Sequence, residues 1–335
     1  MSVSEIGEFA LIRRLAKRLG AAASSDLLLG IGDDAAVWRA GDQVLLATTD
    51  TMVEGVHFLS GVPWTDVGWK ALAVNVSDIA AMGGTPLFAL VTLALPPRTG
   101  ERDIEALYDG LSESARRYGV TVAGGDIVRA PQVSVTVALI GRAEQKDGEP
   151  LLLRRDCAQA GDVIAVTGTL GDSAAGLRRL KEDVAASGPL ARAHLRPAPP
   201  LAVAQLAVRL GIICGMDVSD GLLQDVGHIC EMSKLGADVH ADAVPISAEL
   251  RAAYPDDALA LACSGGEDYQ LVLVGPRERV ERLQTQVEMP IAVIGEITTG
   301  PPRARLLDAA GAEIHLDSPG WDQLRPHGRP SGRSG

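Results

Sequence analysis

The segment KALAVNVSDIAAMGG, residues 70–84, is apolar on almost every side when it is drawn as a helix. Within 71–82, only Asn75, Ser77 and Asp78 interrupt the apolar run. A helix without a polar face is a buried helix, and residues three apart share one side of it, as Asn75 and Asp78 do. A buried carboxylate is costly unless it is paired or binds a cation, and no Lys or Arg lies within a turn of Asp78.

Three explanations of Asp78 remain open from this segment alone. It caps a second helix after a break at Ser77, it meets a distant Arg, or it ligates a cation. The rest of the chain favours the cation, because acids recur in the same setting.

The composition favours a two-domain globular protein that does not bind nucleic acid. The 335 residues are 47% hydrophobic and only 3% aromatic, so Val, Leu, Ile and Ala must fill a sizeable core. The formal net charge of −12 argues against a nucleic-acid surface or an anionic membrane surface. A phosphorylated substrate is compatible with this charge if metal ions screen the acids.

The cysteines and the N-terminus favour a reducing compartment. The four cysteines have neither Cys-x-x-Cys spacing nor a nearby His at zinc spacing, so we expect small buried hydrophobes at Cys157, Cys214, Cys230 and Cys263. Acidic Glu5 and Glu8 stand near an N-terminus without a signal-type apolar core, and no apolar run reaches membrane-spanning length. We therefore expect a soluble, cytoplasmic protein that does not associate with a membrane.

Strands and helices are interleaved along the chain, which favours an α/β or mixed α+β fold over a helical bundle. We expect a capping-box helix at 2–19, a buried helix from about Thr65, and further helices at 101–118, to about 181, at 201–210 and at 221–234. Strands are expected at 44–50, 86–95, 120–126, 132–141, 162–167, 212–220, 291–297 and 304–307, with a Pro-rich connector at 181–200. The polar patch Glu144–Glu149 marks the boundary between an N-terminal domain (1–145) and a C-terminal domain (146–325), followed by a disordered tail (326–335).

Acidic residues stand beside Gly, Ser or Thr, and next to apolar strands or helices, at six places. They are Asp33–Asp34, Asp50, Asp78, Asp126, Asp217–Asp220 and Glu267–Asp268. Each one alone is typical of a turn, but a carboxylate beside a buried strand end also points toward the crevice where α/β proteins bind ligands. Acids that converge repel one another and need cations. Hard oxygens, together with the hydroxyls of Thr48 and Thr49, select Mg²⁺ or Mn²⁺, whose coordination substrate phosphates complete.

The turn GTLGDSAAG, residues 168–176, follows a strand and opens a helix, where backbone amides can hold a phosphate. It matches neither the P-loop nor the G-x-G-x-x-G pattern. Tight strand-to-helix packing explains its glycines equally well.

Taken together, these segments resemble the thiamine-monophosphate kinase family. The stretches that carry the resemblance run in order across nearly the whole chain: GEFALI (7–12), GIGDDAAV (30–37), TTDTMVEGVHF (48–58), KALAVNVSDIAAMGG (70–84), AGGDIVR (123–129), VTGTLGDSAAGL (166–177), HLRPAPPL (194–201), DVSDGLLQDVGHI (217–229) and SGGEDYQL (264–271). The resemblance implies two α/β domains, with N-terminal strands that join a β-barrel across a homodimer. It also implies that ATP phosphorylates thiamine monophosphate to thiamine diphosphate with several Mg²⁺ ions.

The resemblance also implies roles for individual residues. The metal ligands would be Asp34, Thr48, Thr49, Asp50, Asp78, Asp126, Asp217 and Asp220. ATP would contact Gly125, Asp126, Arg155 and Ser219, and the thiamine phosphate would contact His57, Glu267 and Trp321. Asp33 competes with Asp34, and Arg154 with Arg155. Trp321 stands where many relatives carry another aromatic residue, and it keeps a stacking surface.

The substrate phosphate is already a nucleophile at neutral pH, so no catalytic residue beyond the metal ligands is expected, and His57 is expected to contact substrate rather than to act as a base. Without the resemblance, a loop histidine such as His57 is more simply a solvated or backbone-bonded side chain. Other enzymes of the superfamily, which includes aminoimidazole ribonucleotide synthetase and selenophosphate synthetase, are one alternative. The first cysteine is Cys157 and the chain ends in GRSG, which disfavours the relatives that carry a reactive terminal cysteine. A non-catalytic protein that binds Mg²⁺ and thiamine phosphates is the other alternative.

Overall fold

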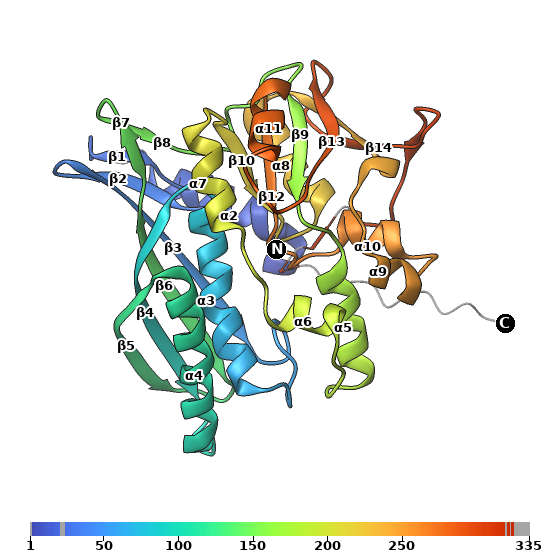
Figure 1. Cartoon of the computed structure of the whole chain (residues 1–335). Helices are drawn as coiled ribbons and strands as arrows, with labels where there is room; N and C mark the ends of the chain where they lie inside the picture. Colours follow the sequence, from blue (N-terminus) through green and yellow to red (C-terminus); the bar gives the residue numbers. More distant parts are fainter. Residues whose placement is uncertain (1, 21–23, 319, 322, 325–335) are drawn as a thin grey trace.

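The computed structural model describes residues 2–20, 24–318, 320–321 and 323–324, so the tail predicted at 326–335 lies outside the described residues. Figure 1 shows two β-sheets side by side, each covered by helices of its own. This arrangement confirms a mixed α/β architecture in two parts. The first sheet ends at Arg142 and the second begins at Val163.

The N-terminal sheet has six strands in the order β1-β2-β3-β6-β4-β5. Their bounds are β1 Leu27–Leu29, β2 Ala36–Ala40, β3 Gln43–Val53, β4 Thr85–Leu95, β5 Thr121–Arg129 and β6 Ser134–Arg142. All neighbours are antiparallel except β4 and β5, which are parallel. β5 is therefore an edge strand.

Two long helices, α3 (Trp64–Ala81) and α4 (Glu101–Tyr118), pack together over one face of this sheet (Figure 1). Fourteen residues of α3 are buried, as predicted for a helix without a polar face. The two helices cross closely at Gly68. A Cβ added there would lie only 1.8 Å from the carbonyl oxygen of Leu107 on the other helix. Glycine at this position therefore allows the backbones to meet, which sets the position of α3 between the sheets.

The C-terminal sheet has seven strands in the order β10-β12-β9-β13-β11-β14-β15. Their bounds are β9 Val163–Thr167, β10 Cys214–Asp217, β11 Gly236–His240, β12 Leu271–Gly275, β13 Ile291–Thr298, β14 Ala304–Leu307 and β15 Glu313–Ile314. A small hairpin, β7 (Glu144–Lys146) with β8 (Glu149–Leu151), lies between the two sheets in the chain.

Helices cover both faces of the C-terminal sheet. Their bounds are α5 Asp172–Glu182, α6 Pro189–Leu195, α7 Leu201–Arg209, α8 Leu222–Ser233, the 3₁₀ turn η1 Ala241–Ala243, α9 Ala248–Ala253, α10 Ala258–Ser264 and α11 Arg277–Gln284. Alternate residues of β9 point into different cores: Ile164 packs with α8 and α10, and Ala165 packs with α7 and α11. The second of these cores includes Ala80 and Ala81, so α3 joins the two sheets through its C-terminal end.

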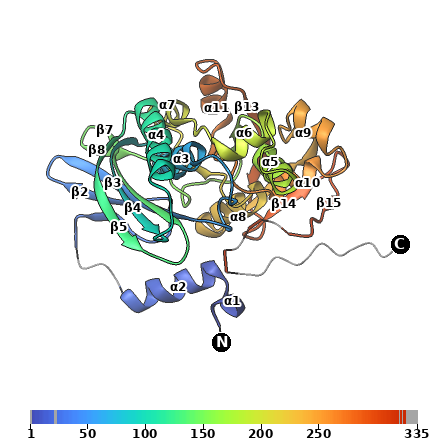
Figure 2. The same cartoon turned by 90° about the horizontal axis from the view of Figure 1, so that it is seen from below.

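Several predicted elements differ from the observed ones. The helix expected at 2–19 breaks at Gly7 (φ 77°) into α1 (Val3–Ile6), which keeps the predicted capping box of Ser2 and Glu5, and α2 (Glu8–Leu19). Both lie to one side of the sheets (Figure 2). The connector at 181–200 contains α6, and β3 and β5 continue beyond Asp50 and Asp126, where strand ends were expected.

Among the described residues, none of the helices combines the length and apolar character needed to cross a bilayer. The four cysteines are all free, and Cys157 alone is partly exposed.

Candidate functional site

Three predicted metal ligands converge between the two sheets. Asp34 lies in the loop before β2, Asp78 in the last turn of α3, and Asp217 at the end of β10. One carboxylate oxygen of each lies within 4.8 Å of the others, which is close enough for a single cation to contact all three. We call Asp34, Asp78 and Asp217 the α3 carboxylate group.

Hydroxyl groups orient two of these carboxylates, and an amide holds the neighbouring strand. Thr48 donates its hydroxyl proton to Asp78, and Ser77 donates its own to Asp217 over 2.5 Å. Asn75, on the same helix, accepts a hydrogen bond from the backbone NH of Asp50 (3.0 Å). α3 continues beyond Asp78 to Ala81, so Asp78 does not cap a second helix, and among the described residues it forms no ion pair with an arginine. Of the three explanations, this geometry favours a cation ligand.

The acids repel one another strongly. Burial, reinforced by neighbouring carboxylates, raises the pKa of Asp78 well above its ordinary value, that of Asp217 to about 8 and that of Asp50 to about 6. The pKa of Asp33 rises to about 7 through burial and the adjacent Asp34. At neutral pH, Asp78 and Asp217 hold protons and Asp33 is partly protonated unless a cation displaces these protons, so the donor set fits a hard divalent metal such as Mg²⁺.

Arg155 is the protein's own cation at this group. Its guanidinium contacts Asp34 closely and lies 3.8 Å from Asp33, and Asp33 also accepts the backbone NH of Asp34 (3.1 Å). Asp34 is the member of the doublet that faces Asp78 and Asp217, so the geometry favours Asp34 over Asp33 as the ligand. Arg154 turns away to Asp156 (2.6 Å), which favours Arg155 over Arg154 at the site.

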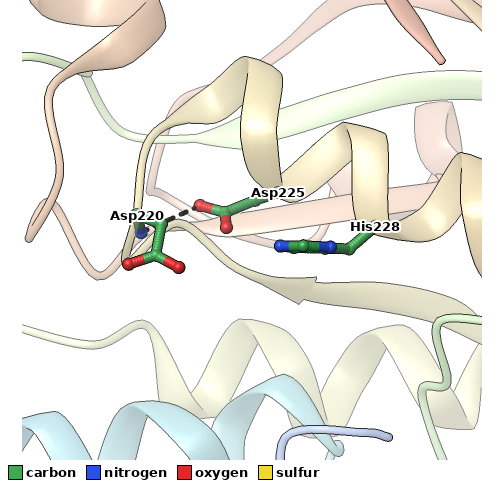
Figure 3. A group of neighbouring side chains, drawn as sticks. All are labelled: Asp220, Asp225 and His228. Carbon is green, nitrogen blue, oxygen red and sulfur yellow. Dashed lines mark hydrogen bonds between the residues drawn. The ribbon is translucent and has the colours of Figure 1, made fainter. Parts of the chain in front are cut away.

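A second group of possible ligands, Asp220, Asp225 and His228, lies at the start of α8 (Figure 3). One oxygen of Asp225 accepts the backbone NH groups of residues 219–221 at 3.1–3.2 Å, which fixes the loop that carries Ser219 and Asp220. Its other oxygen and the Nε2 atom of His228 are buried without a hydrogen-bond partner among the described residues. Buried polar atoms are normally satisfied, so these atoms fit a cation or an ordered water.

Asp225 and His228 were missed from the sequence. An acid and a histidine three residues apart on an otherwise apolar helix are the signal that was available, because such residues share one face. Phe9 of α2 covers the histidine, with ring centroids 4.4 Å apart.

The predicted substrate residues His57 and Glu267 come from the two parts of the molecule, and both contact the ammonium group of Lys70. The carboxylate of Glu267 and the ring of His57 are close enough to shift each other's pKa, and burial lowers the pKa of His57. The backbone NH of Val53 donates to Nδ1 of His57 (3.1 Å), so the histidine is backbone-bonded as well as close to Glu267.

The backbone of Trp321 contacts the loop of the second group, and the same loop accepts the backbone NH of Glu267 through Ser219. The backbone NH of Trp321 donates to the carbonyl oxygen of Asp220 (2.9 Å), and the Trp321 side chain is 38% exposed. Gln323 hydrogen-bonds His57. This part of the chain therefore connects Asp220 with the His57 loop.

The glycine-rich turn at 168–176 does not offer its amides to a phosphate. The carboxylate of Asp268 accepts the NH groups of Gly171 (2.6 Å) and Ser173 (3.1 Å) at the start of α5. The neighbouring residues Glu267 (φ 68°) and Tyr269 (φ 50°) both adopt left-handed backbone angles, which are uncommon outside glycine. The turn thus serves packing, and it holds a strained loop in place.

Thr49, Gly125 and Asp126 are not brought to the α3 carboxylate group. Asp126 pairs through Thr92 and Thr136 with Thr51, so three strand spacings, about 14 Å, separate it from β3. Thr49 and Asp126 are exposed on the face of the sheet away from α3. A Cβ at Gly125 would lie 1.8 Å from the carbonyl oxygen of Val91, so close strand pairing alone explains this glycine.

Comparison with known proteins gives a consistent result. Residues 32–143 match the family described as AIR synthase related protein, N-terminal domain, and residues 159–308 match the corresponding C-terminal domain. The thiamine-monophosphate kinase of Escherichia coli (strain K12) is 37% identical over 328 residues, which cover 95% of this chain and 98% of that protein.

Solved structures agree with the sequence comparison. The structure of AaThiL complexed with AMPPCP and TMP superposes with a TM-score of 0.84 at 33% identity, covering 96% of this chain and 98% of that one. The thiamine-monophosphate kinase of Stenotrophomonas maltophilia K279a gives a TM-score of 0.74 at 38% identity, covering 89% and 96%.

Proposed function

The chain belongs to the thiamine-monophosphate kinase family, and we propose that it transfers the terminal phosphoryl group of ATP directly to thiamine monophosphate, giving ADP and thiamine diphosphate. The observation that carries the proposal is the convergence of Asp34, Asp78 and Asp217 in the middle of a chain that matches these kinases over nearly its whole length. Phosphoryl transfer needs positioning and charge neutralisation more than covalent catalysis.

Several Mg²⁺ ions are part of the proposal. The residues proposed to hold them are Asp34, Thr48, Thr49, Asp50, Asp78, Asp126, Asp217 and Asp220. The raised pKa values of Asp78 and Asp217 support this assignment for the buried acids, because a cluster of this charge is stable in ionised form only beside added cations. For Thr49 and Asp126, on the other face of the sheet, the assignment rests on the family resemblance alone. When bound, Mg²⁺ supplies neutralisation of the charge that spreads over phosphate oxygens.

The protein's own groups have separate tasks at the nucleotide. Arg155 provides a fixed positive charge, since two acids hold its guanidinium in place, and Ser219 presents a loop whose backbone is anchored by Asp225. We propose that both contact ATP, together with Gly125 and Asp126.

At the acceptor, His57, Glu267 and Trp321 are proposed to bind thiamine monophosphate. The attacking group is a phosphate oxygen of the substrate, which is ionised at neutral pH, so the chain needs to orient it rather than remove a proton. The neutral, backbone-bonded ring of His57 suits a positioning contact.

We propose a homodimer formed through the outward face of β4 and β5. Three apolar side chains on this face are 43–49% exposed, namely Phe88, Leu90 and Val128. Leu90 and Val128 lie on either side of the outward-facing Asp126, and exposed apolar side chains gathered on one face of an edge strand and its neighbour suit an interaction site. A second copy seated here would place Gly125 and Asp126 at the boundary between the two chains.

The dimer is tested by Leu90→Glu, which puts a charge into the proposed interface. Size-exclusion chromatography with light scattering should show a dimer for the unchanged protein and a monomer for the variant. A monomer for the unchanged protein at micromolar concentration would contradict the proposed homodimer.

The activity is tested directly by incubating the protein with Mg-ATP and thiamine monophosphate and separating the products. Thiamine diphosphate and ADP should form in equal amounts. If no product forms although calorimetry detects both substrates, the chain is a binding protein instead. Product from aminoimidazole ribonucleotide precursors or selenide, but not from thiamine monophosphate, would indicate another enzyme of the superfamily. We place the reaction in the cytoplasm, because four free cysteines suit a reducing compartment.

A further inference from the structure

Lys70 is a lysine buried in the protein interior, with only 3% of its surface exposed. It lies on α3, and its ammonium group contacts three acceptors. They are Oε1 of Glu267 (2.9 Å), the backbone carbonyl oxygen of His57 (3.3 Å) and Nε2 of His194 (3.4 Å). An ammonium group has three N–H donors, so this set can satisfy every one of them.

His194 completes the arrangement from α6. It is 3% exposed, and burial, reinforced by the nearby Lys70 ammonium, lowers its pKa to about 3, so its ring is neutral. Its Nδ1 atom lies 3.1 Å from the hydroxyl of Ser173 and 3.5 Å from Oε2 of Glu267. The proton is best assigned to Nδ1, because Nε2 must then accept from Lys70.

Glu267 is the member of this cluster that reaches solvent. Its side chain is 24% exposed, whereas those of Lys70 and His194 are 3% exposed. Its backbone is held in the left-handed region by a hydrogen bond from its NH to the carbonyl oxygen of Ser219 (2.8 Å). Burial alone would raise the pKa of Glu267, but the Lys70 ammonium, together with His194 and His57, more than offsets it, and the pKa is lowered.

We propose that Lys70 is a positioning residue of the thiamine-phosphate pocket, which holds the His57 loop and the Glu267 carboxylate in one fixed geometry with the help of His194. The inference rests on the proposed function, since His57 and Glu267 are the substrate contacts in that proposal. It adds two residues, Lys70 and His194, that do not themselves touch the substrate.

Lys70 makes more contacts than an ion pair that serves stability alone requires. A buried pair is often no more stable than apolar side chains of the same volume, so stability alone does not explain a lysine at this position. The third contact of Lys70 is a loop carbonyl of the neighbouring substrate residue, which an ion pair does not require. The cluster also joins α3, α5, α6 and the strained loop before β12, so that both parts of the molecule meet at the pocket.

The test separates substrate binding from the rest of the reaction. Lys70→Met removes the ammonium and keeps the length of the side chain. We expect KM for thiamine monophosphate to rise about 10- to 100-fold, as for loss of a hydrogen bond to a charged group, while KM for ATP changes less than about twofold. Lys146→Met, on the exposed β7–β8 hairpin, is the matched control and should leave both constants unchanged.

Conservative variants sharpen the test. His194→Gln can still accept from Lys70 and donate to Glu267, so it should stay near the unchanged protein, whereas His194→Leu should raise KM for thiamine monophosphate. If Lys70→Met leaves KM for thiamine monophosphate unchanged while the unchanged protein turns this substrate over, the positioning role is wrong and the proposed function stands.

Two further measurements apply if Lys70→Met does not fold or if the unchanged protein does not turn over thiamine monophosphate. If Lys70→Met does not fold, the double variant Lys70→Met/Glu267→Gln removes both buried charges and should fold again, yet it should bind thiamine monophosphate more weakly than Glu267→Gln alone by calorimetry. Binding as tight as that of Glu267→Gln alone would overturn the inference. If the unchanged protein makes no thiamine diphosphate, the proposed function fails, and the same calorimetric comparison of Lys70→Met still decides whether Lys70 organises the pocket.

Discussion

Helix α3 carries two buried charged sites with opposite surroundings: one acid is paired with a cation, and the other is surrounded by acids. Near its N-terminal half, Lys70 brings a cation to Glu267, and the pKa of that carboxyl is lowered. In its last turn, Asp78 meets Asp34, Asp50 and Asp217, and the pKa of Asp78 is raised well above its ordinary value. Arg155 is the only side-chain cation that the described residues place against this second site, where it contacts Asp33 and Asp34.

The comparison shows which part of a buried cluster the protein supplies and which part it leaves to a ligand. The Lys70 site is electrically neutral in the folded chain, whereas the ionised α3 carboxylate group has an excess of negative charge, which bound protons or added cations must offset. Incompleteness of this kind at a buried site is a physical indicator of function, because the chain bears a cost in stability there.

The largest effect is expected for Asp78→Asn. The amide keeps the shape of the side chain and the contact with Thr48, but it removes one charge from the proposed metal site. Turnover of thiamine monophosphate should fall by a factor of about 1,000 or more, as when a group that stabilises transferred charge is lost. Asp109→Asn, exposed on α4, serves as the control. A rate within tenfold of the unchanged protein would remove Asp78 from the reaction.

A smaller effect is expected when Mg²⁺ is withdrawn from the unchanged protein. Ligands that bind only the folded state stabilise it, by about 2.7 kcal/mol at 100 times Kd. Differential scanning calorimetry should therefore show a higher Tm with Mg²⁺ than with a chelator. If the two sites are coupled, Lys70→Met should show no increase in Tm when Mg²⁺ replaces the chelator. An increase as large as that of the unchanged protein would show that the two sites act separately.

The size of this Mg²⁺ effect should depend on pH. The folded-state pKa values of Asp50 and Asp217, about 6 and about 8, lie above those of an unfolded chain. Their contribution to stability is thus complete below about pH 4 and is lost as the pH rises toward 8 in the metal-free protein. The gain in Tm from Mg²⁺ should accordingly grow between pH 5.5 and pH 8. Equal gains at both values would contradict the assignment of raised pKa values to a metal site.

Asp217→Asn should reduce that pH dependence, because it removes the group with the raised pKa of about 8. In the absence of metal, the fall in Tm between pH 5.5 and pH 8 should be smaller than in the unchanged protein. Asp42→Asn, which changes an exposed acid between β2 and β3, should leave the profile as it was. A profile identical in all three proteins would show that Asp217 does not titrate in this range.

The smallest effect concerns an ion pair at the surface. Arg303 and Glu313 form an ion pair in which 54% of the arginine side chain is exposed, whereas the Lys70 side chain that pairs with Glu267 is only 3% exposed. Exposed pairs contribute little, so Glu313→Gln should leave Tm within measurement error, in contrast to Glu267→Gln at the buried site. A clear fall in Tm for Glu313→Gln would contradict the expectation that the ion pair at the surface contributes less stability than the Lys70–Glu267 pair.

The helices that could be predicted best from the sequence were those with a strong local pattern. Helix 101–118 was predicted at its observed bounds, because its amphipathic pattern lies between Gly100 and Gly119. The buried α3 was recognisable from its apolar composition alone. Helix α6 was overlooked within a Pro-rich connector, although Pro189 at its start is typical of a helix N-terminus.

For the site, the sequence indicated the acids but not the geometry that unites them. The expectation that strand ends would gather the carboxylates holds for Asp217 alone, since Asp50 lies within β3 and Asp78 comes from a helix. Asp126 was grouped with them by the family resemblance, yet it lies on the opposite face of the sheet. The contacts of Lys70 with His194 and Glu267 join residues more than 120 positions apart, which no local pattern can reveal.

Lys70 and Asp78 are eight residues apart on one uninterrupted helix, so about 12 Å of helical rise separates the acceptor pocket from the acidic site. The spacing fixes the orientation of one site relative to the other, because inserting one residue between them would turn one site by about 100°. We therefore expect this interval to keep its length in related chains, because one residue gained or lost would turn the proposed acceptor pocket away from the proposed metal site.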